Sequence, residues 1–419
     1  MKIKYCTIKQ FKEKVNEKKI IGFGASRLAK EFVFQYPDIA SKISFFVDNN
    51  KKIVGTNICF DNKCWEIFSP DVLDRGGYNA DEYIVLIFSN SYKDIMHQCK
   101  EYKLMDTVEC YIYPLMSDDF FSIYQKFQWE QERLLSPVLH MYKEMMQING
   151  ESEDSILKIQ KTKRAQMLEE GKFIIPKVNF LVTTKCTLRC KNCIGMIPYL
   201  QGEHCEKSSV MDDMKNFFRC LDECTVVEIG GGEPFLYPDM EEILKYLISE
   251  KKVTYIRIPT NGTVIPSESV TKLLQNEKVS LYISNYGFDV ITKRFMNYVK
   301  ENRIRNIFCE DMQWIDAGGL EIRNKSPLQK MIEYYICSAG KLCKTVYNGR
   351  LYHCARVARI QKIDASIEDD SIKLTDDSGD AEMREYVKAF FMKTNCVGCD
   401  YCDLANVDAE IIKAGIQIT

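Results

Sequence analysis

The sequence lacks the features that mark membrane, secreted or nucleic-acid-binding proteins. No stretch approaches the ~18 uncharged apolar residues that a membrane span needs. The charged start, MKIKYCTIKQFKEKVNEKK, has no apolar run of a signal peptide. The 57 Lys and Arg nearly balance the 59 Asp and Glu, so there is no global positive field to attract nucleic acid. Among 419 residues only 21 are Gly and 11 Pro. We therefore expect a cytoplasmic, globular protein of two or three domains, with no nucleic-acid or membrane partner.

Cysteine is the residue that the sequence has in excess. Eighteen cysteines in a chain without an export signal should not be interpreted as nine disulfides, because the cytosol keeps thiols reduced. Nine of them form three groups, a pattern typical of metal sites: Cys186, Cys190 and Cys193; Cys337, Cys343 and Cys354; and Cys396, Cys399 and Cys402. The others are scattered, and we expect most to be small buried or surface residues; they are Cys6, Cys59, Cys64, Cys99, Cys110, Cys205, Cys220, Cys224 and Cys309.

Residues 1–116 alternate strand-like and helix-like patterns. Strands are expected at residues 20–23 and in SKISFFVDNN, DEYIVLIFSN and TVECYIYP, with helices between them. This alternation predicts a doubly wound parallel sheet, a small Rossmann-like domain. Residues 117–175 are polar and helix-periodic, and we interpret them as a helical connector.

Residues 176–330 predict a second α/β unit. Five short apolar strands (VNFLVTT, TVVEIG, VTYIRIP, VSLYISN and RNIFCE) alternate with helices expected near 211–224, 239–250, 267–276 and 288–301, and a sixth strand is expected around 314–322. A partial (β/α)5–6 barrel suits this pattern better than a flat sheet, and in both cases ligands bind beyond the carboxyl ends of the strands. Residues 331–419 add a hairpin (TVYNGRLYHCARV), an acidic loop, a helix near 381–392 and the last cysteines.

The loop after the first strand of this unit carries three cysteines, Cys186, Cys190 and Cys193, in the spacing C-x3-C-x2-C. Thiolates are the ligands of iron–sulfur clusters, and three on one short loop can converge on one cubane with one iron left open. Zinc is the alternative, although structural zinc sites prefer paired C-x2-C knuckles and four protein ligands.

A second motif, IGGGEPFLYP at 229–238, follows the next strand. Gly231 and Gly232 permit a tight turn and expose backbone N–H groups and carbonyls, while Glu233 adds a negative charge. Further polar strand ends follow in IPTNG (258–262) and YISNYG (282–287).

Together, CTLRCKNC and GGEPFLYP resemble the radical S-adenosylmethionine (SAM) superfamily over roughly residues 176–320. The resemblance implies that Cys186, Cys190 and Cys193 ligate a [4Fe–4S] cluster that binds SAM, and that Gly231, Gly232 and Glu233 contact the methionine amino group. It nominates four residues for the ribose and carboxylate of SAM, although they also suit polar turns and helix caps: Thr260, Asn261, Ser284 and Asn285. An external electron donor of the flavodoxin or ferredoxin type is implied as well.

The C-terminal cysteines resemble the auxiliary-cluster extension of these enzymes, called SPASM or, in its shorter form, twitch. The resemblance rests on Cys337, Gly349 and Cys354. Six thiols cannot fully ligate two [4Fe–4S] clusters, so we expect one auxiliary [4Fe–4S] cluster and two spare thiols. Our choice of ligands is Cys337, Cys354, Cys396 and Cys399, with Cys343 and Cys402 as further candidates. Structural zinc stays open here, and His353 is expected on the hairpin surface.

In the N-terminal domain, GFGASR follows a strand and opens a helix, the position of a phosphate-binding turn. Gly22 and Gly24 match the first two glycines of G-x-G-x-x-G, but Arg27 stands at the third. Asp48 ends the second strand, where an acid can bind a ribose hydroxyl. The domain resembles Rossmann-like units of sugar-modifying proteins, which implies a nucleotide or nucleotide-sugar ligand; an empty docking domain is the alternative.

These observations lead to one functional hypothesis with two rivals. The hypothesis is a radical SAM oxidoreductase that reductively cleaves SAM to a 5′-deoxyadenosyl radical, abstracts hydrogen from a small-molecule substrate and modifies a carbohydrate or nucleotide-linked metabolite. The rivals are a peptide-modifying radical SAM/SPASM maturase and a non-catalytic iron–sulfur or zinc binding module. The sequence singles out no general acid or base.

Overall fold

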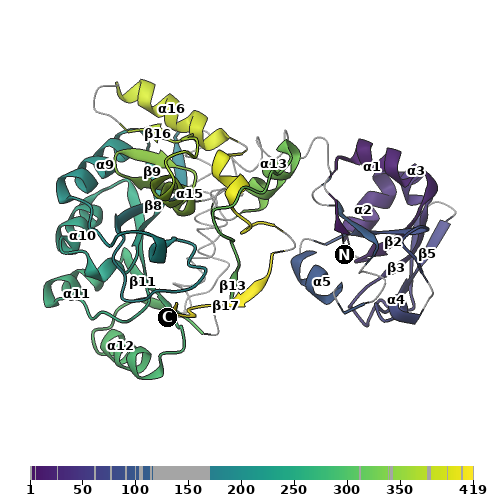
Figure 1. Cartoon of the computed structure of the whole chain (residues 1–419), viewed down its shortest axis with the longest axis horizontal. Coiled ribbons are helices and arrows are strands. Elements are labelled where there is room, and N and C mark those ends of the chain that lie inside the picture. The colour runs from purple at the N-terminus through teal and green to yellow at the C-terminus, as the bar shows by residue number, and fades with distance from the viewer. Residues whose placement is uncertain are drawn as a thin grey trace. The chain divides into compact units, whose positions relative to one another are not determined.

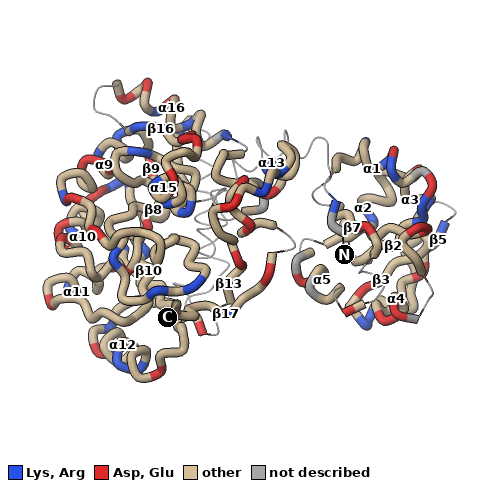
Figure 2. The backbone as a smooth tube through the Cα atoms, viewed as in Figure 1, with Lys and Arg blue, Asp and Glu red and all other residues tan. Residues whose placement is uncertain are grey.

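The computed structural model describes residues 2–116 and 170–418, apart from 5, 26, 61–62, 76–77, 90–91, 100, 103–106, 114–115, 311–312, 338, 340–342, 375–378, 394 and 407–408. The expected connector at 117–175 therefore lies almost wholly outside the described residues. The chain divides into two compact units, Met1–Tyr124 and Gln125–Thr419 (Figure 1). No helix among the described residues combines the length and the apolar character needed to cross a membrane. Basic and acidic positions are interspersed along the backbone of both units (Figure 2).

The first unit is a seven-stranded sheet with helices between its strands. Its elements are β1 (Lys2–Ile3), α1 (Ile8–Lys14), η1 (Val15–Glu17), β2 (Lys19–Phe23), α2 (Arg27–Gln35), α3 (Pro37–Ala40), β3 (Ile43–Val47), β4 (Asn57–Phe60), β5 (Lys63–Phe68), α4 (Val72–Arg75), β6 (Tyr83–Ile87), α5 (Tyr92–Cys99) and β7 (Glu109–Ile112). The four strands expected from the sequence are present as β2, β3, β6 and β7.

The strand order in this sheet is β1-β7-β6-β2-β3-β5-β4. All neighbouring pairs are parallel except β4 with β5. The central order β5-β3-β2-β6-β7 reproduces the 3-2-1-4-5 order of a mononucleotide-binding fold. The chain first adds strands on one side of β2 and then, from β6 on, adds them on its other side, which makes β2 the switch point of the sheet. The expected parallel α/β sheet is therefore confirmed for this unit.

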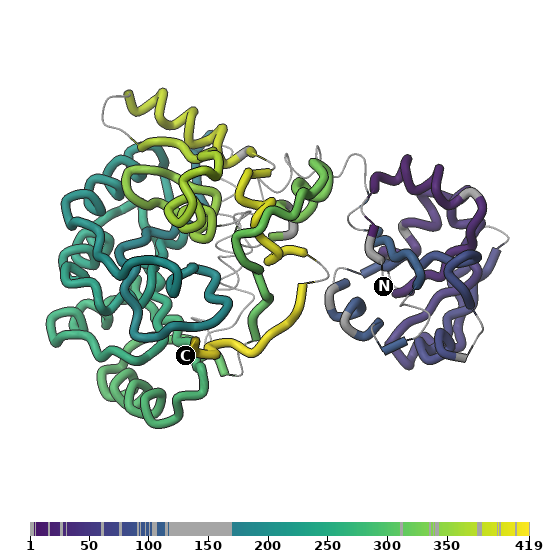
Figure 3. Tube along the Cα trace, in the orientation of Figure 1, coloured from purple at the N-terminus to yellow at the C-terminus, as the bar shows by residue number. Residues whose placement is uncertain are grey.

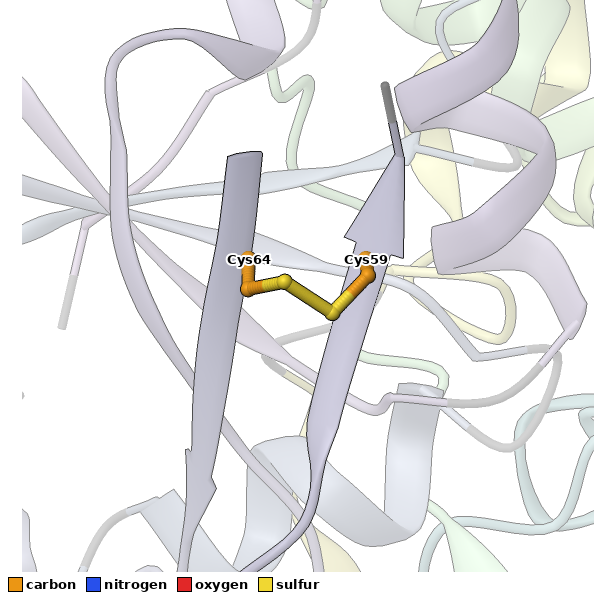
Figure 4. Close-up of a disulfide and its surroundings, with 2 residues drawn as sticks. All are labelled: Cys59 and Cys64. Atoms are coloured by element: carbon orange, nitrogen blue, oxygen red, sulfur yellow. A yellow bond between two sulfur atoms is a disulfide. The ribbon is translucent and has the colours of Figure 1, made fainter. Parts of the chain in front are cut away.

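Two of the scattered cysteines form a disulfide that the sequence pattern did not indicate. Cys59 and Cys64 form a disulfide across the β4–β5 hairpin (Figure 4). The two residues face each other directly in the antiparallel register, with their Cα atoms 4.1 Å apart, so the short hairpin brings the two sulfur atoms together. The two cysteines are only five residues apart in the chain. The number of cysteines and the expected cellular compartment do not indicate such a local pair.

The second unit contains an eight-stranded sheet and a separate two-stranded ribbon. Its elements are β8 (Ile174–Thr183), η5 (Ile197–Tyr199), α9 (Lys207–Arg219), β9 (Glu223–Gly231), η6 (Pro234–Leu236), α10 (Met240–Ser249), β10 (Val253–Thr260), α11 (Glu268–Leu274), β11 (Val279–Ser284), α12 (Asp289–Glu301), β12 (Asn306–Cys309), β13 (Gln313–Ile315), α13 (Pro327–Ile336), β14 (Cys343–Tyr347), β15 (Arg350–Tyr352), α15 (Ala355–Ile363), β16 (Ile372–Lys373), α16 (Asp380–Met392), η7 (Val397–Tyr401) and β17 (Ile411–Lys413).

The large sheet has the order β12-β11-β10-β9-β8-β14-β15-β16. The five strands β8 to β12 are parallel and adjacent in chain order, as the sequence predicts. The helix expected at 211–224 ends earlier, at Arg219, because β9 begins at Glu223 and pairs with β8 from Ile174 onward.

The sixth strand is not where the sequence places it. Residues 313–315 form β13, which pairs antiparallel with the C-terminal β17 outside the large sheet, where the two segments run side by side in Figure 3. The sixth parallel position is taken by β14, which lies on the other side of β8. β14 and β15 form the predicted hairpin, and its turn residues Asn348 and Gly349 both have positive φ, as a two-residue turn of this kind requires.

The faces of β8 show how the sheet separates core from site. Val178, Phe180 and Val182 belong to the main apolar core, which also includes Phe217 and Phe218 of α9. Helices α9 to α12 cover this face of the sheet (Figure 1). The alternate residues of β8 face the opposite way because successive side chains of a strand alternate. That opposite face carries the polar groups described below.

Asp213 links α9 to the β14–β15 hairpin. Because its pKa is raised in the folded protein, we expect it to make stability depend on pH. It is buried, its Oδ2 accepts the backbone N–H of Gly349 at 3.1 Å, and burial raises its pKa from 3.8 to about 6. The folded protein therefore keeps a proton that the unfolded chain releases, and stability falls as the pH rises from about 4 to about 6.

The Asp213→Asn variant has no such proton. Its free energy of unfolding relative to the wild type is expected to rise between pH 4 and pH 7, by at most about 3 kcal/mol. Denaturant unfolding of both proteins across this range measures the difference. A difference that stays constant with pH contradicts the prediction.

Candidate functional site

The three grouped cysteines of the second unit line one cavity. Cys186, Cys190 and Cys193 follow β8, whose carboxyl end is Thr183, and all three border a cavity of about 270 Å³ at the ends of the parallel strands. Left-handed backbone at Asn192 and Met196 turns the loop sharply. The predicted convergence of these side chains on one place is therefore present.

The end of the chain holds this loop in position. Gln417 Nε2 donates to Cys190 Sγ at 3.2 Å, and Gln417 Oε1 accepts the Arg189 N–H at 2.7 Å. Lys191 N–H donates to the carbonyl of Ile416 at 2.6 Å. Sequence reasoning missed these residues because they lie more than two hundred positions away in the chain.

Burial disfavours the thiolate form of two of these cysteines, Cys186 and Cys190. Burial raises the pKa of Cys186 to about 11, and burial also raises the pKa of Cys190. Asn261 Nδ2 and the Leu188 N–H lie 3.5 and 3.4 Å from Cys186 Sγ, so two donors face the sulfur atom. Cluster assembly must displace the protons, since thiolates are the ligands.

Gly231 and Gly232 are needed because two backbone segments meet without room for a side chain. A Cβ at Gly231, where φ is +149°, would lie 2.3 Å from the Thr183 carbonyl oxygen; a Cβ at Gly232 would lie 2.1 Å from that of Lys185. The N–H groups of Gly232 and Glu233 donate to these same carbonyls, at 2.9 and 2.8 Å. The glycine motif is thus joined directly to the start of the cysteine loop, and both glycines line the cavity.

Glu233 differs from expectation in its position. Its side chain is fully buried and is not part of the cavity wall. Oε1 accepts the Thr260 hydroxyl at 2.9 Å, and Oε2 accepts the Asn261 N–H at 2.9 Å. Burial raises its pKa to about 7, although these donors oppose the shift. Glu233 therefore connects the end of β9 to the end of β10 from behind.

Of the four residues nominated for SAM, three line the cavity: Thr260, Asn261 and Ser284. Asn285 does not, because it follows Ser284 on the alternate side of the strand end, and its Oδ1 accepts the Gly287 N–H at 3.0 Å. The sequence missed two aromatic residues of the wall, Tyr286 and Trp314, whose rings form an edge-to-face pair at 5.5 Å. Trp314 comes from β13, the strand that had been expected in the large sheet.

Five of the six C-terminal cysteines lie together. Burial, with a smaller effect from the nearby thiols of Cys337, Cys402 and Cys399, raises the pKa of Cys354. Cys396 and Cys399 are in sulfur–sulfur contact at 3.3 Å, and this contact raises the pKa of Cys396.

Cys343 stands apart from this group. It is the first residue of β14, opposite Lys177 of β8, and burial beside Lys177 and Glu228 raises its pKa to about 11. Of the two further candidates, the structure therefore places Cys402 with the other thiols and separates Cys343 from them.

A buried lysine supports the last cysteine loop. Lys325 and Glu333 are only 2% and 3% exposed and form an ion pair at 2.6 Å. Lys325 Nζ also donates to the carbonyls of Cys399 and Cys402. The pairing satisfies a charge that would otherwise be costly to bury, and it fixes the backbone between the two cysteines.

His353 is not on the hairpin surface. It is completely buried, its Nδ1 lies 2.8 Å from the Tyr334 hydroxyl, and its ring stacks on Phe390 at 4.2 Å. Burial lowers its pKa to about 2, so the ring is neutral. The sequence pattern of a hairpin does not show that α13 and α16 cover this residue.

In the first unit the predicted turn leaves no room for a side chain at either of its two glycines. A Cβ at Gly22 would lie 2.4 Å from the Phe46 ring, and one at Gly24, where φ is +96°, would lie 3.0 Å from the Phe88 carbonyl oxygen. Asp48 Oδ2 accepts the Ala25 N–H at 2.7 Å and Oδ1 accepts the Asn50 N–H at 2.8 Å, so both oxygens already support the turn. The Arg27 side chain lies outside the described residues.

The donor set of the main cavity fits an iron–sulfur cluster. Within the described ranges, no three His, Cys, Asp or Glu side chains converge closely enough for a single metal ion. A [4Fe–4S] cluster does not require this, because its thiolates bind separate irons. Three thiols on one loop that face one cavity supply such a donor set.

Comparison with known proteins agrees with this geometry. Residues 180–307 match the model of the Radical SAM superfamily, whose members use a [4Fe–4S] cluster and SAM. The chain is 26% identical over 174 residues to GTP 3′,8-cyclase of Aliarcobacter butzleri (strain RM4018), covering 40% of this chain and 53% of the cyclase. It is 27% identical over 150 residues to a putative L-lysine 2,3-aminomutase of Aquifex aeolicus (strain VF5), covering 36% and 39%. The chain thus spans about half or less of these relatives.

Solved structures are similar only in outline. BtrN in complex with AdoMet and 2-DOIA has a TM-score of 0.37 and 12% identity, covering 55% of this chain and 93% of that one. SuiB of Streptococcus suis bound to precursor peptide SuiA has a TM-score of 0.32 and 12% identity, covering 61% and 76%. At these scores neither structure supports an inference about the substrate of this chain.

The contact between the glycine motif and the cysteine loop can be tested with two alanine variants that both face Lys185. In Gly232→Ala the new Cβ meets backbone at 2.1 Å, which must displace the loop; we expect a loss of about 1–3 kcal/mol or more in stability and a clear drop in iron bound after anaerobic reconstitution. In Gly202→Ala the nearest atom is the flexible Lys185 Cγ at 3.2 Å, so iron content is expected to stay at the wild-type level. Equal iron in the two variants contradicts the close-approach argument.

Proposed function

We propose that this chain, whose residues 180–307 form a radical SAM domain, is a radical SAM enzyme in which Cys186, Cys190 and Cys193 hold the [4Fe–4S] cluster. The observation that supports this most directly is that the three thiols, both motif glycines and the polar ends of β10 and β11 line one cavity. We infer further that β8 to β12 and β14 form the six parallel strands of a partial barrel, with an auxiliary region after residue 330.

The residues of the cavity have distinct proposed tasks. When bound, the cluster supplies the electron that cleaves SAM to methionine and a 5′-deoxyadenosyl radical. The backbone of Gly231 and Gly232 offers carbonyl groups beside the cysteine loop for the methionine amino group, since no side chain intervenes. Thr260, Asn261 and Ser284 offer hydrogen bonds to the ribose and carboxylate. Glu233 holds the β10 end in place from behind instead of contacting the ligand itself.

The walls of the cavity also serve to protect a radical. Tyr286 and Trp314 close one side with aromatic surface, and Leu181, Leu188 and Ile197 add apolar surface elsewhere in the wall. Such walls exclude water and confine the reactive carbon to the bound substrate.

The reaction outcome that we propose is an oxidation. The substrate loses a hydrogen atom to the 5′-deoxyadenosyl radical and then an electron and a proton, so that two electrons leave it in total. The auxiliary thiol group, drawn from Cys337, Cys354, Cys396, Cys399 and Cys402, would hold a second [4Fe–4S] cluster that accepts the electron. An external one-electron donor of the flavodoxin or ferredoxin type would reduce the first cluster.

The substrate that we propose is a carbohydrate or nucleotide-linked metabolite. Two features of the first unit support this substrate class. They are the 3-2-1-4-5 strand order and the turn of Gly22 and Gly24, which follows β2 at the switch point of the sheet. Asp48 would act there by fixing the turn, since both its oxygens accept backbone N–H groups.

Reductive SAM cleavage tests the function. Protein reconstituted anaerobically with iron and sulfide, then given dithionite and SAM, is expected to form 5′-deoxyadenosine. The triple variant Cys186→Ala/Cys190→Ala/Cys193→Ala is expected to form none and to keep about half the iron, since a [4Fe–4S] cluster needs its thiolate ligands. Well-loaded wild-type protein that forms no 5′-deoxyadenosine would contradict the proposal and favour a binding module.

The auxiliary cluster is tested by two cysteines that differ in their surroundings. Cys354→Ala removes a thiol from the C-terminal group and is expected to lower bound iron by up to about half, as for one cluster of two. Cys343→Ala removes a thiol that faces Lys177 and Glu228 and is expected to leave iron content unchanged. If zinc, and not iron, is lost from Cys354→Ala, the group is a structural zinc site.

A further inference from the structure

Arg359 is a buried cation that the proposed chemistry does not use. It belongs to α15, is 1% exposed and forms part of the cavity wall together with Cys193 and Gly231. Its Nη2 donates to the Thr183 carbonyl at 3.3 Å, and the guanidinium packs over the Tyr347 ring at 4.7 Å. Nε and Nη1 have no hydrogen-bond partner within the part of the chain that the structure describes.

Other buried cations of this unit show what is missing at Arg359. Lys325 pairs with Glu333, and Lys177 pairs with Glu228 at 2.6 Å. Arg356, one turn earlier on the same helix, has Met196 Sδ and the carbonyls of Gly318, Gly319 and Tyr401 as partners of its two Nη atoms, whereas its Nε has no hydrogen-bond partner among the described residues. Among the described residues, Arg359 contacts the Thr183 carbonyl and Tyr347, the thiols of Cys205 and Cys193 lie nearby, and none of these groups is a carboxylate. A buried guanidinium without a counter-charge is costly, which points to a partner that the chain itself does not supply.

The charge of the surrounding wall points to the sign of that partner. Glu228 also lines the cavity, but two cations already face it: Lys177 at 2.6 Å and Arg257 at 3.7 Å. This group of three is therefore net positive before Arg359 is added. Asn179, 7% exposed and also in the wall, has an unpartnered Oδ1 that can accept from a hydroxyl or ammonium group of the same ligand.

The position of Arg359 in the chain separates it from the cofactor machinery. The match to the Radical SAM superfamily ends at residue 307, and the polar strand ends available for SAM lie within it. Arg359 enters the cavity from α15, outside that segment. A residue supplied from outside the shared domain is suited to the ligand that differs between such enzymes, the substrate.

We propose that Arg359 binds an anionic group of the substrate, a carboxylate or phosphate, and that the substrate of this cavity is a small hydrogen-bonding anion. The inference rests on the proposed function and narrows its substrate class. The guanidinium keeps unused N–H donors on Nε and on Nη1, and each of them can donate to an oxygen of such a group. An anion held there lies beside Cys193 and hence beside the cysteine loop.

The test compares three variants of the reconstituted full-length protein. Arg359→Met removes the charge at similar length, Arg359→Lys keeps it, and Lys362→Met removes a cation from the same helix that pairs with Glu203 and does not line the cavity. The probes are inorganic phosphate and acetate, titrated into SAM-saturated protein by calorimetry and thermal shift. SAM and its decarboxylated analogue are titrated separately, and the cluster absorbance of each variant reports intact assembly.

The expected result is loss of phosphate and acetate binding by about tenfold or more in Arg359→Met, with partial retention in Arg359→Lys and wild-type behaviour in Lys362→Met. SAM affinity should change by less than about twofold, well under the tenfold that 1.4 kcal/mol represents.

Two results overturn the proposal. One is identical behaviour of the wild type and Arg359→Met toward both anions, including the absence of binding in both. The other is weaker SAM binding in Arg359→Met with unchanged affinity for decarboxylated SAM, which assigns Arg359 to the cofactor carboxylate. Both readouts are binding constants, so they stand whether or not the loaded wild type forms 5′-deoxyadenosine.

Discussion

The candidate site depends on the direct meeting of two backbone segments, the end of β8 and the turn after β9. The carbonyls of Thr183 and Lys185 accept the N–H groups of Gly232 and Glu233, and a side chain at Gly231 or Gly232 would occupy the same space as these carbonyls. A bond that needs such proximity leaves little choice of residue. These hydrogen bonds also fix the point at which the cysteine loop leaves β8, and therefore where the three thiols lie.

From that junction the order of the site extends across the sheet through buried polar contacts. Glu233 reaches behind the wall to Thr260 and Asn261, and Asn261 in turn points its amide at Cys186. The end of β10 is thereby linked back to the first cysteine of the loop. Because the carboxylate is fully buried and held by three donors, the turn after β9, the end of β10 and the cysteine loop after β8 constrain one another.

Local pattern was enough to predict the parts of the molecule that are built locally. The five parallel strands, the Asn348–Gly349 hairpin and the cysteine loop follow from apolar runs, turn residues and short spacing. What the sequence could not show depends on contacts between distant segments. Gln417 reaches the cysteine loop from the chain end, and β13 leaves the large sheet because β17 pairs with it.

The same distinction explains why some candidate residues lie apart from the others. Cys343 and Cys402 look alike in a list of spacings, yet one begins a strand beside Lys177 and the other follows η7 among four thiols. Glu233 and Asn285 were assigned to the ligand by their place in a motif, whereas strand alternation and burial direct both side chains elsewhere.

Helix α15 shows why the C-terminal region and the cavity should be considered together. Cys354 is its N-cap, and Arg359 lies five residues further on, about 7–8 Å along the axis at 1.5 Å per residue. One end of the helix thus belongs to the five-thiol group and the next turn and a half reaches the cavity wall. Helix α15 therefore joins the thiol group to the cavity wall within nine residues.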